Sequence, residues 1–565
     1  MPASAPTRTG GQMIAASLAR HGVEAVFCVP GESYLEVLDA LNDHPDIQVV
    51  ACRHEHGAAD MAEAYAKLTG RVGVCMVTRG PGACNASIGV HTAFQDSTPM
   101  LLLVGQVPTH FMGREAFQEV DFTAMFAPLA KKAVEIKRTQ DAPTVMADAF
   151  HAAMSDRRGP VVVALPEDVL SGRAEVPDPA PTPVTVREPG AGDLNHLQDL
   201  LARAERPMLM VGGGGWSDTA RTSVQAFAER NRVPVCCSFR RLDIMDNAST
   251  TYAGEMGIAP NPKLLARMAA ADLVMVLGAR LGEMTSQGYT LFDAPGPAQT
   301  LVHVHADETA LGRVFEPARS IHANVSSFAE SLGAIGIAGD VAARQDWCAA
   351  ARRDFEDWQS PPSYPGELDL GQVMMTLRAR MPANAIVSVD AGNFSGWPQR
   401  FLRFGGRRFL GATNGAMGYG VPGAVAAKVA HPGRMVVGFA GDGGFGMTGQ
   451  EIATAMQLGL DPLIIVFNNG MYGTIRMHQE REHPGRVIAT DLTNPDFADL
   501  ARSYGAHGEA VSCTDDFAPA LDRAMKAGRA ALIELRMNPD QITTRGTLSS
   551  IREAALEKEK QDETK

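Results

Sequence analysis

The sequence lacks any long, uninterrupted run of apolar residues. No stretch approaches the ~18 to 20 consecutive apolar residues that span a bilayer. The N-terminal segment, MPASAPTRTGGQMIAASLARHG, has no continuous apolar core before Arg20, so it does not have the pattern of a secretory signal. These absences predict a cytoplasmic protein that does not interact with membranes.

The chain is also short of positive charge. Its 565 residues include 51 Lys and Arg against 64 Asp and Glu, which gives a net charge of −13. Nucleic acids and anionic membranes require a clustered positive face, so we expect neither as a partner. With 45% hydrophobic and 20% charged residues, the composition is that of an ordinary folded protein.

Cysteine is sparse and scattered, without a Cys-x-x-Cys pair or a Cys/His metal spacing. The eight cysteines are Cys28, Cys52, Cys75, Cys84, Cys236, Cys237, Cys348 and Cys513. Several lie in apolar runs that look like strands, such as Val74-Cys75-Met76. The pattern predicts reduced thiols in the core and no zinc site.

The length of the chain exceeds what one hydrophobic core supports, and about three or four domains are expected. Two stretches look like linkers: residues 175–193 contain five prolines without apolar periodicity, and residues 354–369 are acidic and proline-rich. They separate an N-terminal domain (1–175), a central Rossmann-like domain (190–345) and a C-terminal domain (366–545).

Each of these segments alternates short β-branched runs with helical patterns. Residues 47–52 (IQVVAC) predict a buried strand, and residues 57–70 predict a helix that ends at Gly70. Residues 273–278 (LVMVLG) and 462–467 (PLIIVF) are continuous apolar runs of the same kind. Because these runs do not alternate with polar residues, we expect three α/β domains, each with a mainly parallel sheet flanked by helices.

The segment GDGGFG, residues 441–446, follows an apolar run and matches the dinucleotide fingerprint G-x-G-x-x-G. Two features argue against a dinucleotide. Asp442 places a carboxylate where a pyrophosphate should meet bare backbone. Asp461, twenty positions beyond Gly441, precedes the next strand instead of following it, whereas Asn468 and Asn469 occupy the carboxyl end.

Asp442 and Asn469 follow neighbouring predicted strands and should therefore converge at the carboxyl edge of the sheet. A carboxylate and an amide oxygen suit a hard cation such as Mg²⁺, which would bridge Asp442 to a phosphate. Thr448 and Glu451 have the T-x-x-E spacing of a capping box, which predicts a helix that starts just beyond the glycines. Together these residues predict a metal-dependent phosphate site.

These residues carry a resemblance to a known family. GDG followed by the two asparagines resembles the thiamine diphosphate motif, and residues ~10 to 540 resemble the acetohydroxyacid (acetolactate) synthase-like family of thiamine diphosphate enzymes. The shared segments occur in the same order and are VPGESYLEVLDAL, RHEHGAADMAEAYAKLTG, RGPGACNASIGVHTAFQDSTPML, GREAFQEVD and GAMGYGVPGAVAAKVA. The resemblance implies a pyrimidine-binding, a central and a diphosphate-binding domain, joined at the two linkers.

The resemblance assigns the catalytic role to Glu55, in the pattern R-H-E-x-G-A-A. In the family this glutamate protonates the far nitrogen of the cofactor's aminopyrimidine, which demands an apolar setting that raises its pKa. The family builds each site from the pyrimidine domain of one subunit and the diphosphate domain of another. A homodimer or homotetramer is therefore implied, in which Glu55 and Asp442 of one site come from different chains.

The family's other cofactor-binding positions fall in the C-terminal domain. They are Asn393, Met417, Asp442, Gly443, Asn469 and Met471. Asp442 and Asn469 through their side chains, and Met471 through its backbone carbonyl, are the implied ligands of Mg²⁺. Met417 matches the bulky residue that holds the cofactor bent. Residue 394 departs from the family, because it is Phe where synthases often carry His.

Four residues are candidates for the substrate pocket. Phe117 and Gln118 lie in GREAFQE, which matches a segment that lines the family's reaction centre. His91 and His478 are candidates by position, with a structural or surface role as the alternative.

The function that the resemblance implies is decarboxylation of a 2-keto acid followed by carboligation, dependent on thiamine diphosphate and Mg²⁺. Two pyruvate molecules would give 2-acetolactate and CO₂, a reaction of branched-chain amino acid biosynthesis. Two departures weaken this specificity. Residues 476–480 (RMHQE) lack the tryptophan of biosynthetic synthases, and residues 278–284 and 252–262 differ from the family's flavin-contacting stretches, so FAD is not supported.

Other functions stay open at this point. One is another thiamine diphosphate enzyme, such as a simple 2-keto acid decarboxylase, a 2-hydroxyacyl-CoA lyase or an acetyltransferase. A different class is an oxidoreductase that binds a dinucleotide at GDGGFG or at residues 210–215 (MVGGGG). A non-catalytic paralogue would lack Glu55, Asp442 or Asn469, and all three are present.

Overall fold

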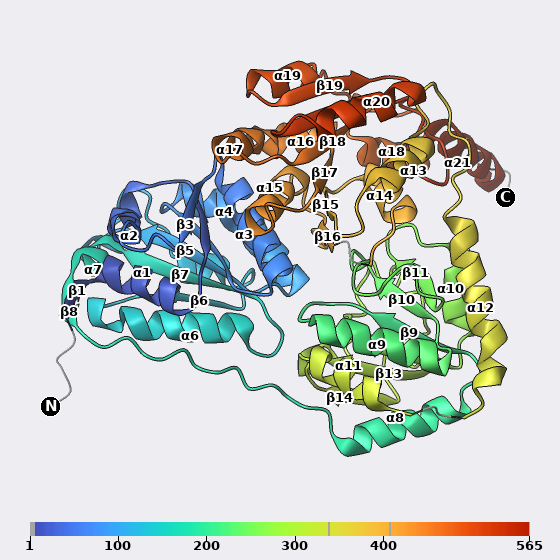
Figure 1. The fold of residues 1–565 in the computed structure, drawn as a ribbon, viewed down its shortest axis with the longest axis horizontal. Helices are drawn as coiled ribbons and strands as arrows, with labels where there is room; N and C mark the ends of the chain where they lie inside the picture. Colours follow the sequence, from blue (N-terminus) through green and yellow to red (C-terminus); the bar gives the residue numbers. More distant parts are fainter. Residues whose placement is uncertain (1–5, 337–338, 406–407, 564–565) are drawn as a thin grey trace. The chain divides into compact units, whose positions relative to one another are not determined.

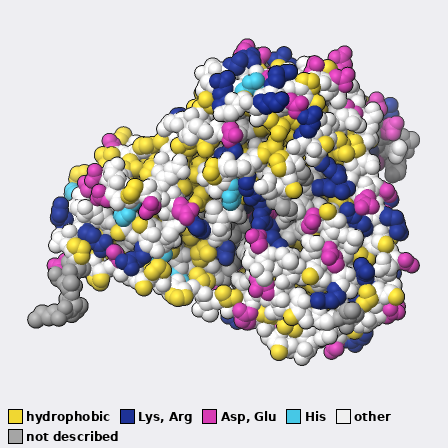
Figure 2. Space-filling model, viewed as in Figure 1, with side chains coloured by type: hydrophobic (Ala, Val, Ile, Leu, Met, Phe, Trp, Pro, Cys, Tyr) yellow, Lys and Arg dark blue, Asp and Glu magenta, His cyan; other side chains and the backbone are white. Residues whose placement is uncertain are grey.

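The computed structural model describes residues 6–336, 339–405 and 408–563. Its contacts divide the chain into two compact units, residues 1–185 with 425–432 and residues 186–424 with 433–565. Within the described ranges, no helix is both long and apolar enough to cross a membrane. The face shown in Figure 2 mixes acidic, basic and apolar side chains.

The first unit is built on a six-stranded parallel sheet with strand order β3-β2-β4-β5-β7-β6. The strands are Gln48–Ala51 (β3), Ala25–Cys28 (β2), Gly73–Val77 (β4), Met100–Gln106 (β5), Pro160–Pro166 (β7) and Lys132–Glu135 (β6). The helices are Gly10–Arg20 (α1), Leu35–Leu41 (α2), Glu55–Thr69 (α3), Pro81–Asp96 (α4), Phe122–Phe126 (α5), Ala142–Met154 (α6) and Glu167–Ser171 (α7). A short antiparallel pair, Thr7–Thr9 (β1) and Arg173–Glu175 (β8), completes it.

Helices cover both faces of this sheet (Figure 1). α1 and α6 pack on one face, and α3 and α4 pack against each other and on the other face. The strands β4, β5 and β7 are therefore buried along their whole length, as continuous apolar strands of a parallel sheet require. β3 is an edge strand with Val49 exposed, so the expectation that residues 47–52 form a buried strand is wrong.

Helix α3 begins at Glu55, where His54 caps it by accepting the N–H of His56. Gly70 caps its other end with φ of 70°, a left-handed conformation that glycine adopts without strain. The end predicted at Gly70 is confirmed. The start lies slightly earlier than predicted, and this places Glu55 in the first turn of the helix.

The second unit contains two more six-stranded parallel sheets. The first has the order β11-β10-β9-β12-β13-β14. Its strands are Tyr252–Met256 (β11), Val235–Ser238 (β10), Pro207–Val211 (β9), Leu273–Leu277 (β12), Thr300–His305 (β13) and Arg319–His322 (β14). Its helices are Ala191–Arg203 (α8), Asp218–Asn231 (α9), Pro262–Ala270 (α10), Val325–Ala334 (α11) and Val341–Trp358 (α12).

The other sheet of this unit has the order β16-β15-β17-β18-β20-β19. Its strands are Arg408–Gly411 (β16), Ile386–Val389 (β15), Val436–Gly441 (β17), Leu463–Asn468 (β18), Ala531–Arg536 (β20) and His507–Val511 (β19). Its helices are Leu370–Arg380 (α13), Gly396–Phe401 (α14), Gly420–Ala430 (α15), Asp442–Thr448 (α16), Ile452–Gln457 (α17), Gly473–Glu482 (α18), Phe497–Ser503 (α19), Thr514–Met525 (α20) and Leu548–Glu563 (α21). Residues 425–430 of α15 are grouped with the first unit. Three parallel sheets with flanking helices confirm the predicted fold class, while the exact domain boundaries stay predictions.

The glycines at 212–215 follow β9, and their structural role is visible in the neighbouring strand. Gly213 has φ of 70°, and a Cβ at this position would lie 2.0 Å from the carbonyl oxygen of Gly278, which follows β12. Backbone therefore packs directly on backbone at the carboxyl edge of this sheet. This contact gives Gly213 a structural role that does not require a dinucleotide at residues 210–215.

Candidate active site

Two neighbouring strands of the C-terminal sheet end side by side, and polar residues follow both. In the parallel ladder of β17 and β18, Gly441 lies opposite Phe467. Asp442 comes directly after Gly441, and Asn468 and Asn469 come directly after Phe467. The register therefore brings the carboxylate and the two amides to one edge of the sheet, as the sequence predicts.

The expectation that Thr448 and Glu451 form a capping box is wrong. α16 begins at Asp442, so the glycines form its first turn. The hydroxyl of Thr448 instead donates to the carbonyl oxygen of Gly418 at 2.6 Å, and Glu451 accepts a hydrogen bond from Thr454 at 2.6 Å. Thr448 thus bonds to backbone 30 residues away and Glu451 to a side chain three residues further along, so neither caps the helix as expected.

The carboxylate of Asp442 is buried and held by three N–H groups. Its Oδ1 accepts from the backbone of Gly443 at 2.9 Å, and its Oδ2 accepts from the backbone of Gly470 at 2.8 Å and from Asn494 Nδ2 at 2.9 Å. Burial raises the pKa of Asp442, and these hydrogen bonds oppose that shift. Asn494 was not predicted from the sequence, because it lies 52 positions from Asp442 and meets it only in the folded protein.

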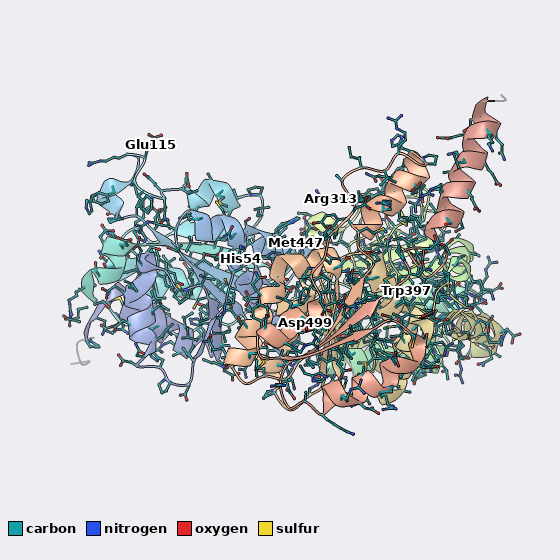
Figure 3. All side chains as sticks on the ribbon, turned by 90° about the horizontal axis from the view of Figure 1, so that it is seen from above. His54, Glu115, Arg313, Trp397, Met447 and Asp499 are labelled. Carbon is teal, nitrogen blue, oxygen red and sulfur yellow. The ribbon has the colours of Figure 1, made fainter. Side chains whose placement is uncertain are left out.

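A cavity of about 240 Å³ opens beside Asp442. Its walls come from loops at the ends of several strands, chiefly residues 391–394, 441–444 and 471–475. The six cofactor-binding positions predicted for this domain all line it, namely Asn393, Met417, Asp442, Gly443, Asn469 and Met471. Trp397, which also lines the cavity, is fully buried and lies well inside the second unit (Figure 3).

Gly443 and Gly444 allow neighbouring side chains to pack directly against the backbone of residues 441–444. A Cβ at Gly443 would lie 2.6 Å from the ring of Tyr472, and one at Gly444 would lie 2.1 Å from Oδ2 of Asp390. Neither position tolerates a side chain without displacing a neighbour. The glycines are therefore required by the fold of the cavity, independently of any ligand.

Asn393 and Phe394 form the wall next to α18. The backbone N–H of Asn393 donates to Thr474 Oγ1 at 3.0 Å, and its side-chain amide lies 3.3 Å from the sulfur of Met477. Phe394 packs on Phe467 with 5.1 Å between ring centroids. Residue 394 thus supplies an apolar wall where a histidine would offer a polar contact.

Asp390 is a buried carboxyl group that the sequence did not single out. It follows β15, and its Oδ1 accepts N–H groups from Ala391 at 2.6 Å and Gly418 at 2.7 Å. Burial raises its pKa to about 7. Arg240, from the central sheet, donates to the carbonyl oxygens of Asp390 at 3.0 Å and Ala412 at 2.8 Å. These contacts fix two of the loops that line the cavity.

Glu55 lies in the first unit, at the start of α3 (His54, labelled in Figure 3, precedes it). It is half-buried, and its Oε2 accepts a hydrogen bond from Asn85 Nδ2, on α4, at 3.0 Å. A Cβ at Gly82 would lie 3.5 Å from the other oxygen, Oε1. The described part of this unit thus gives Glu55 an amide partner and partial exposure, and the apolar setting expected between subunits stays a prediction.

Phe117 and Gln118 lie on a loop fastened to the segment RGPG. The carbonyl oxygen of Phe117 accepts from Arg79 Nε at 3.3 Å, while the Phe117 side chain is 73% exposed. Gln118 adopts a positive φ of 64°. Glu115, on the same loop, projects away from the first unit (Figure 3).

The two candidate histidines, His91 and His478, differ in burial and lie on different helices. His91 is half-buried on α4, the helix that carries Asn85. His478 is exposed on α18 and is not among the residues lining the cavity, to which α18 contributes Gly473, Thr474 and Ile475. The cavity therefore gives His478 no support as a pocket residue.

Sequence profiles of thiamine pyrophosphate (thiamine diphosphate) enzymes match three parts of the chain. The N-terminal binding domain matches residues 8–125, the central domain residues 194–332 and the C-terminal binding domain residues 390–535. The chain belongs to the thiamine pyrophosphate enzyme family. This confirms the resemblance, the fold class and thiamine diphosphate as the cofactor.

Similar proteins cover nearly the whole chain. The acetolactate synthase isozyme 2 large subunit of Escherichia coli is 30% identical over 538 residues, which cover 94% of this chain and 95% of that protein. The acetolactate synthase large subunit of Haemophilus influenzae is 30% identical over 558 residues, with 94% and 95% covered. The E. coli isozyme 3 large subunit is 31% identical over 542 residues, with 92% and 93% covered. The chain is therefore an acetolactate synthase-like, thiamine diphosphate-dependent enzyme.

Proposed function

We propose that the enzyme decarboxylates a 2-keto acid and joins the product to a second carbonyl compound, with thiamine diphosphate and Mg²⁺ held in the cavity at Asp442. The product we propose is 2-acetolactate, formed with CO₂ from two molecules of pyruvate. One observation carries the proposal: six positions expected to bind the cofactor, spread over residues 393–471, line a single cavity. The activity named for the E. coli and H. influenzae relatives supports the product.

The donor set beside Asp442 fits a hard divalent cation. A buried carboxylate, the side-chain amide of Asn469 and the backbone carbonyl of Met471 are oxygen ligands, which Mg²⁺ prefers. Asn469 Oδ1 accepts the N–H of Met471 at 3.2 Å, so the amide and the peptide that follows it are already held together. In this proposal the three residues hold Mg²⁺, which neutralises the charge between Asp442 and the diphosphate.

Gly443 and Met417 complete the fit of the cofactor. Gly443 exposes backbone to the cavity, which lets phosphate oxygens approach closely. Met417 is a large apolar side chain on the opposite loop, suited to contact a ring. When bound, thiamine diphosphate supplies an electron sink that accepts the electron pair released when a 2-keto acid loses CO₂.

Glu55 is the proposed proton donor and acceptor. Asn85 donates to Oε2 and fixes the plane of the carboxyl group, and no described residue of the first unit donates a hydrogen bond to Oε1. In this arrangement Oε1 would face the pyrimidine of bound thiamine diphosphate, where Glu55 would hold and release a proton. Burial against a second subunit would exclude water from this carboxyl group.

A homodimer or homotetramer is part of the proposal. Glu55 belongs to the first unit and Asp442 to the second, and each site would combine the two from different subunits. The first unit carries large exposed apolar side chains, including Phe117 at 73%, Leu35 at 58% and Phe111 at 46% exposure. Such side chains suit burial in an interface between subunits.

The test is a substrate panel on the purified full-length protein. After incubation with thiamine diphosphate, Mg²⁺ and each of a series of 2-keto acids, CO₂ release and the identity of the product are measured. Pyruvate should give CO₂ and 2-acetolactate in a ratio of one to one. Release of CO₂ with free acetaldehyde would show that the enzyme is a simple decarboxylase and not a carboligase. Absence of turnover with every 2-keto acid would overturn the proposal.

A further inference from the structure

Asn494 connects the two strand ends that carry the proposed metal ligands. Its side-chain Nδ2 donates to Asp442 Oδ2 at 2.9 Å and to Asn468 Oδ1 at 2.9 Å. Asn494 lies in the loop before α19 and is half-buried. One amide thus bridges the residue that follows β17 and the last residue of β18.

The two oxygens of Asp442 accept different numbers of hydrogen bonds. Oδ2 receives two N–H groups, from Asn494 and from Gly470, whereas Oδ1 receives one, from Gly443. A carboxylate held this way cannot rotate about its Cβ–Cγ bond without breaking hydrogen bonds in a buried site. The contact with Asn494 therefore fixes the direction in which the remaining lone pairs of Asp442 point.

The other end of the bridge is anchored in the sheet. Asn468 Nδ2 donates to Glu534 Oε1, on β20, at 2.7 Å, and Asn468 Oδ1 also accepts the N–H of Gly470 at 3.2 Å. Glu534 is 1% exposed. The position of Asn494 is thus set by a chain of hydrogen bonds that runs from the proposed metal ligand to a buried carboxylate two strands away.

We propose that Asn494 is a positioning residue for the cation at Asp442. This inference rests on the proposed function, because it assumes that Asp442 holds Mg²⁺ with the cofactor. Asn494 acts only through Asp442 and Asn468 and does not itself ligate the ion. Partners that orient a metal ligand in this way typically change metal affinity about 10- to 100-fold when they are removed.

The experiment compares Asn494→Leu, which keeps the side-chain volume and removes the N–H, with the wild-type protein. Thr493→Ala, at the exposed neighbouring position, is the matched control. Chelator-treated full-length protein is titrated with Mg²⁺ at fixed thiamine diphosphate, and cofactor binding is followed by tryptophan fluorescence. Mn²⁺ binding is measured separately by electron paramagnetic resonance, and the unfolding temperature of the metal-free protein is recorded.

In Asn494→Leu, the Mg²⁺ concentration at half-maximal cofactor binding should rise about 10- to 100-fold, and Mn²⁺ binding should weaken in parallel. Saturating Mg²⁺ should restore kcat, and the unfolding temperature of the metal-free protein should equal that of the wild type. Thr493→Ala should match the wild type throughout. Asn494→Ala, which leaves less bulk beside Asp442, should show the same shift.

Two results would overturn the inference. One is a Mg²⁺ midpoint in both Asn494 variants that equals that of the wild type. The other is a lower unfolding temperature of both variants without metal, which would make Asn494 a structural residue. If the wild-type protein itself binds no thiamine diphosphate in response to Mg²⁺, the proposed function fails as well, so the two failures are distinguishable.

Discussion

The side-chain amide of Asn85 donates a hydrogen bond to Oε2 of Glu55 at 3.0 Å. Glu55 begins α3, and Asn85 lies in the second turn of α4, the helix that packs against α3. The orientation of Glu55 therefore depends on the packing of two helices as well as on its own helix. In the proposed function this contact leaves Oε1 as the oxygen that meets the cofactor.

Replacing Glu55 with Gln should separate binding from turnover. Gln keeps the shape of the side chain but cannot hold and release the proton, so kcat should fall about 10²- to 10⁴-fold. Thiamine diphosphate affinity should change little, because the metal and diphosphate contacts are in the other unit. Steady-state kinetics and direct cofactor titration measure the two quantities, and an unchanged kcat would remove Glu55 from its role.

Replacing Asn85 with Ala should lower kcat about tenfold, because the lost hydrogen bond is worth about 1 to 1.5 kcal/mol and holds the Glu55 carboxyl group in place. The loss should be smaller than in Glu55→Gln, because the carboxyl group is still present. Ser87→Ala is the control, because Ser87 lies on the same helix and its hydroxyl donates to the carbonyl oxygen of Cys84, away from Glu55. Equal kcat values for Asn85→Ala and the wild type would show that Glu55 does not need this amide.

Asp390 predicts a pH dependence of stability. Its pKa in the folded protein is about 7, above its usual value of 3.8, and Arg240 is the charged group that faces it. The folded state therefore holds a proton that the unfolded state releases, so this contribution to stability decreases as the pH rises from about 4 to about 7. The decrease is on the order of 1.4 kcal/mol per pH unit between the two pKa values.

Asp390→Asn removes this titration while preserving the size of the side chain. The unfolding temperature of the variant relative to the wild type should therefore increase between pH 5 and pH 8. Scanning calorimetry at a series of pH values measures this difference. A constant difference across that range would contradict the burial of an ionisable group at this position.

The C-terminal helix α21 is attached through Arg552 and Glu480. Arg552 Nε donates to the buried carboxylate of Glu480, on α18, at 2.7 Å, and this guanidinium lowers the pKa of Glu480. Arg552→Ala leaves that carboxylate with fewer donors and should destabilise the helix docking by about 1 to 3 kcal/mol. Limited proteolysis should then cut α21 faster than in the wild type.

The sign of the pH effect gives a second check on this pair. Because the folded pKa of Glu480 is lowered, the pair stabilises the fold at pH values above the ordinary glutamate pKa of 4.5. That stabilisation is lost as the pH falls through the lowered value. The difference between wild type and Arg552→Ala should therefore shrink in acid, and a difference that grows in acid would be inconsistent with the ion pair.

The sequence was sufficient to predict features that depend on local pattern and strand order. Continuous apolar runs predicted the parallel sheets, and the expectation that Asp442 and Asn469 converge followed from the rule that parallel strands end at a common edge. The predicted start of the helix after the glycines was wrong, because Thr448 and Glu451 bond to Gly418 and Thr454 and not to each other's backbone. The spacing of Thr448 and Glu451 alone does not reveal which other groups compete for their hydrogen bonds.

Asn85, Asp390 and Asn494 were missed for the same physical reason. Asn85 bonds to Glu55, Asn494 bonds to Asp442, and Asp390 bonds to Gly418, the residue after Met417, so each contact joins residues far apart in the chain. Asparagine and aspartate are also common in loops and helix starts, so their identity carries little information by itself. Contacts of this kind, between residues far apart in the chain, become visible only in the folded structure.

The central claim is that Asp442 and its neighbours bind thiamine diphosphate through Mg²⁺. The most direct test is calorimetric titration of chelator-treated protein with thiamine diphosphate, with and without Mg²⁺, for the wild type and for Asp442→Ala. Mg²⁺ should strongly increase cofactor affinity in the wild type, and this increase should be absent in Asp442→Ala. The same Mg²⁺-dependent affinity in Asp442→Ala as in the wild type would contradict the central claim.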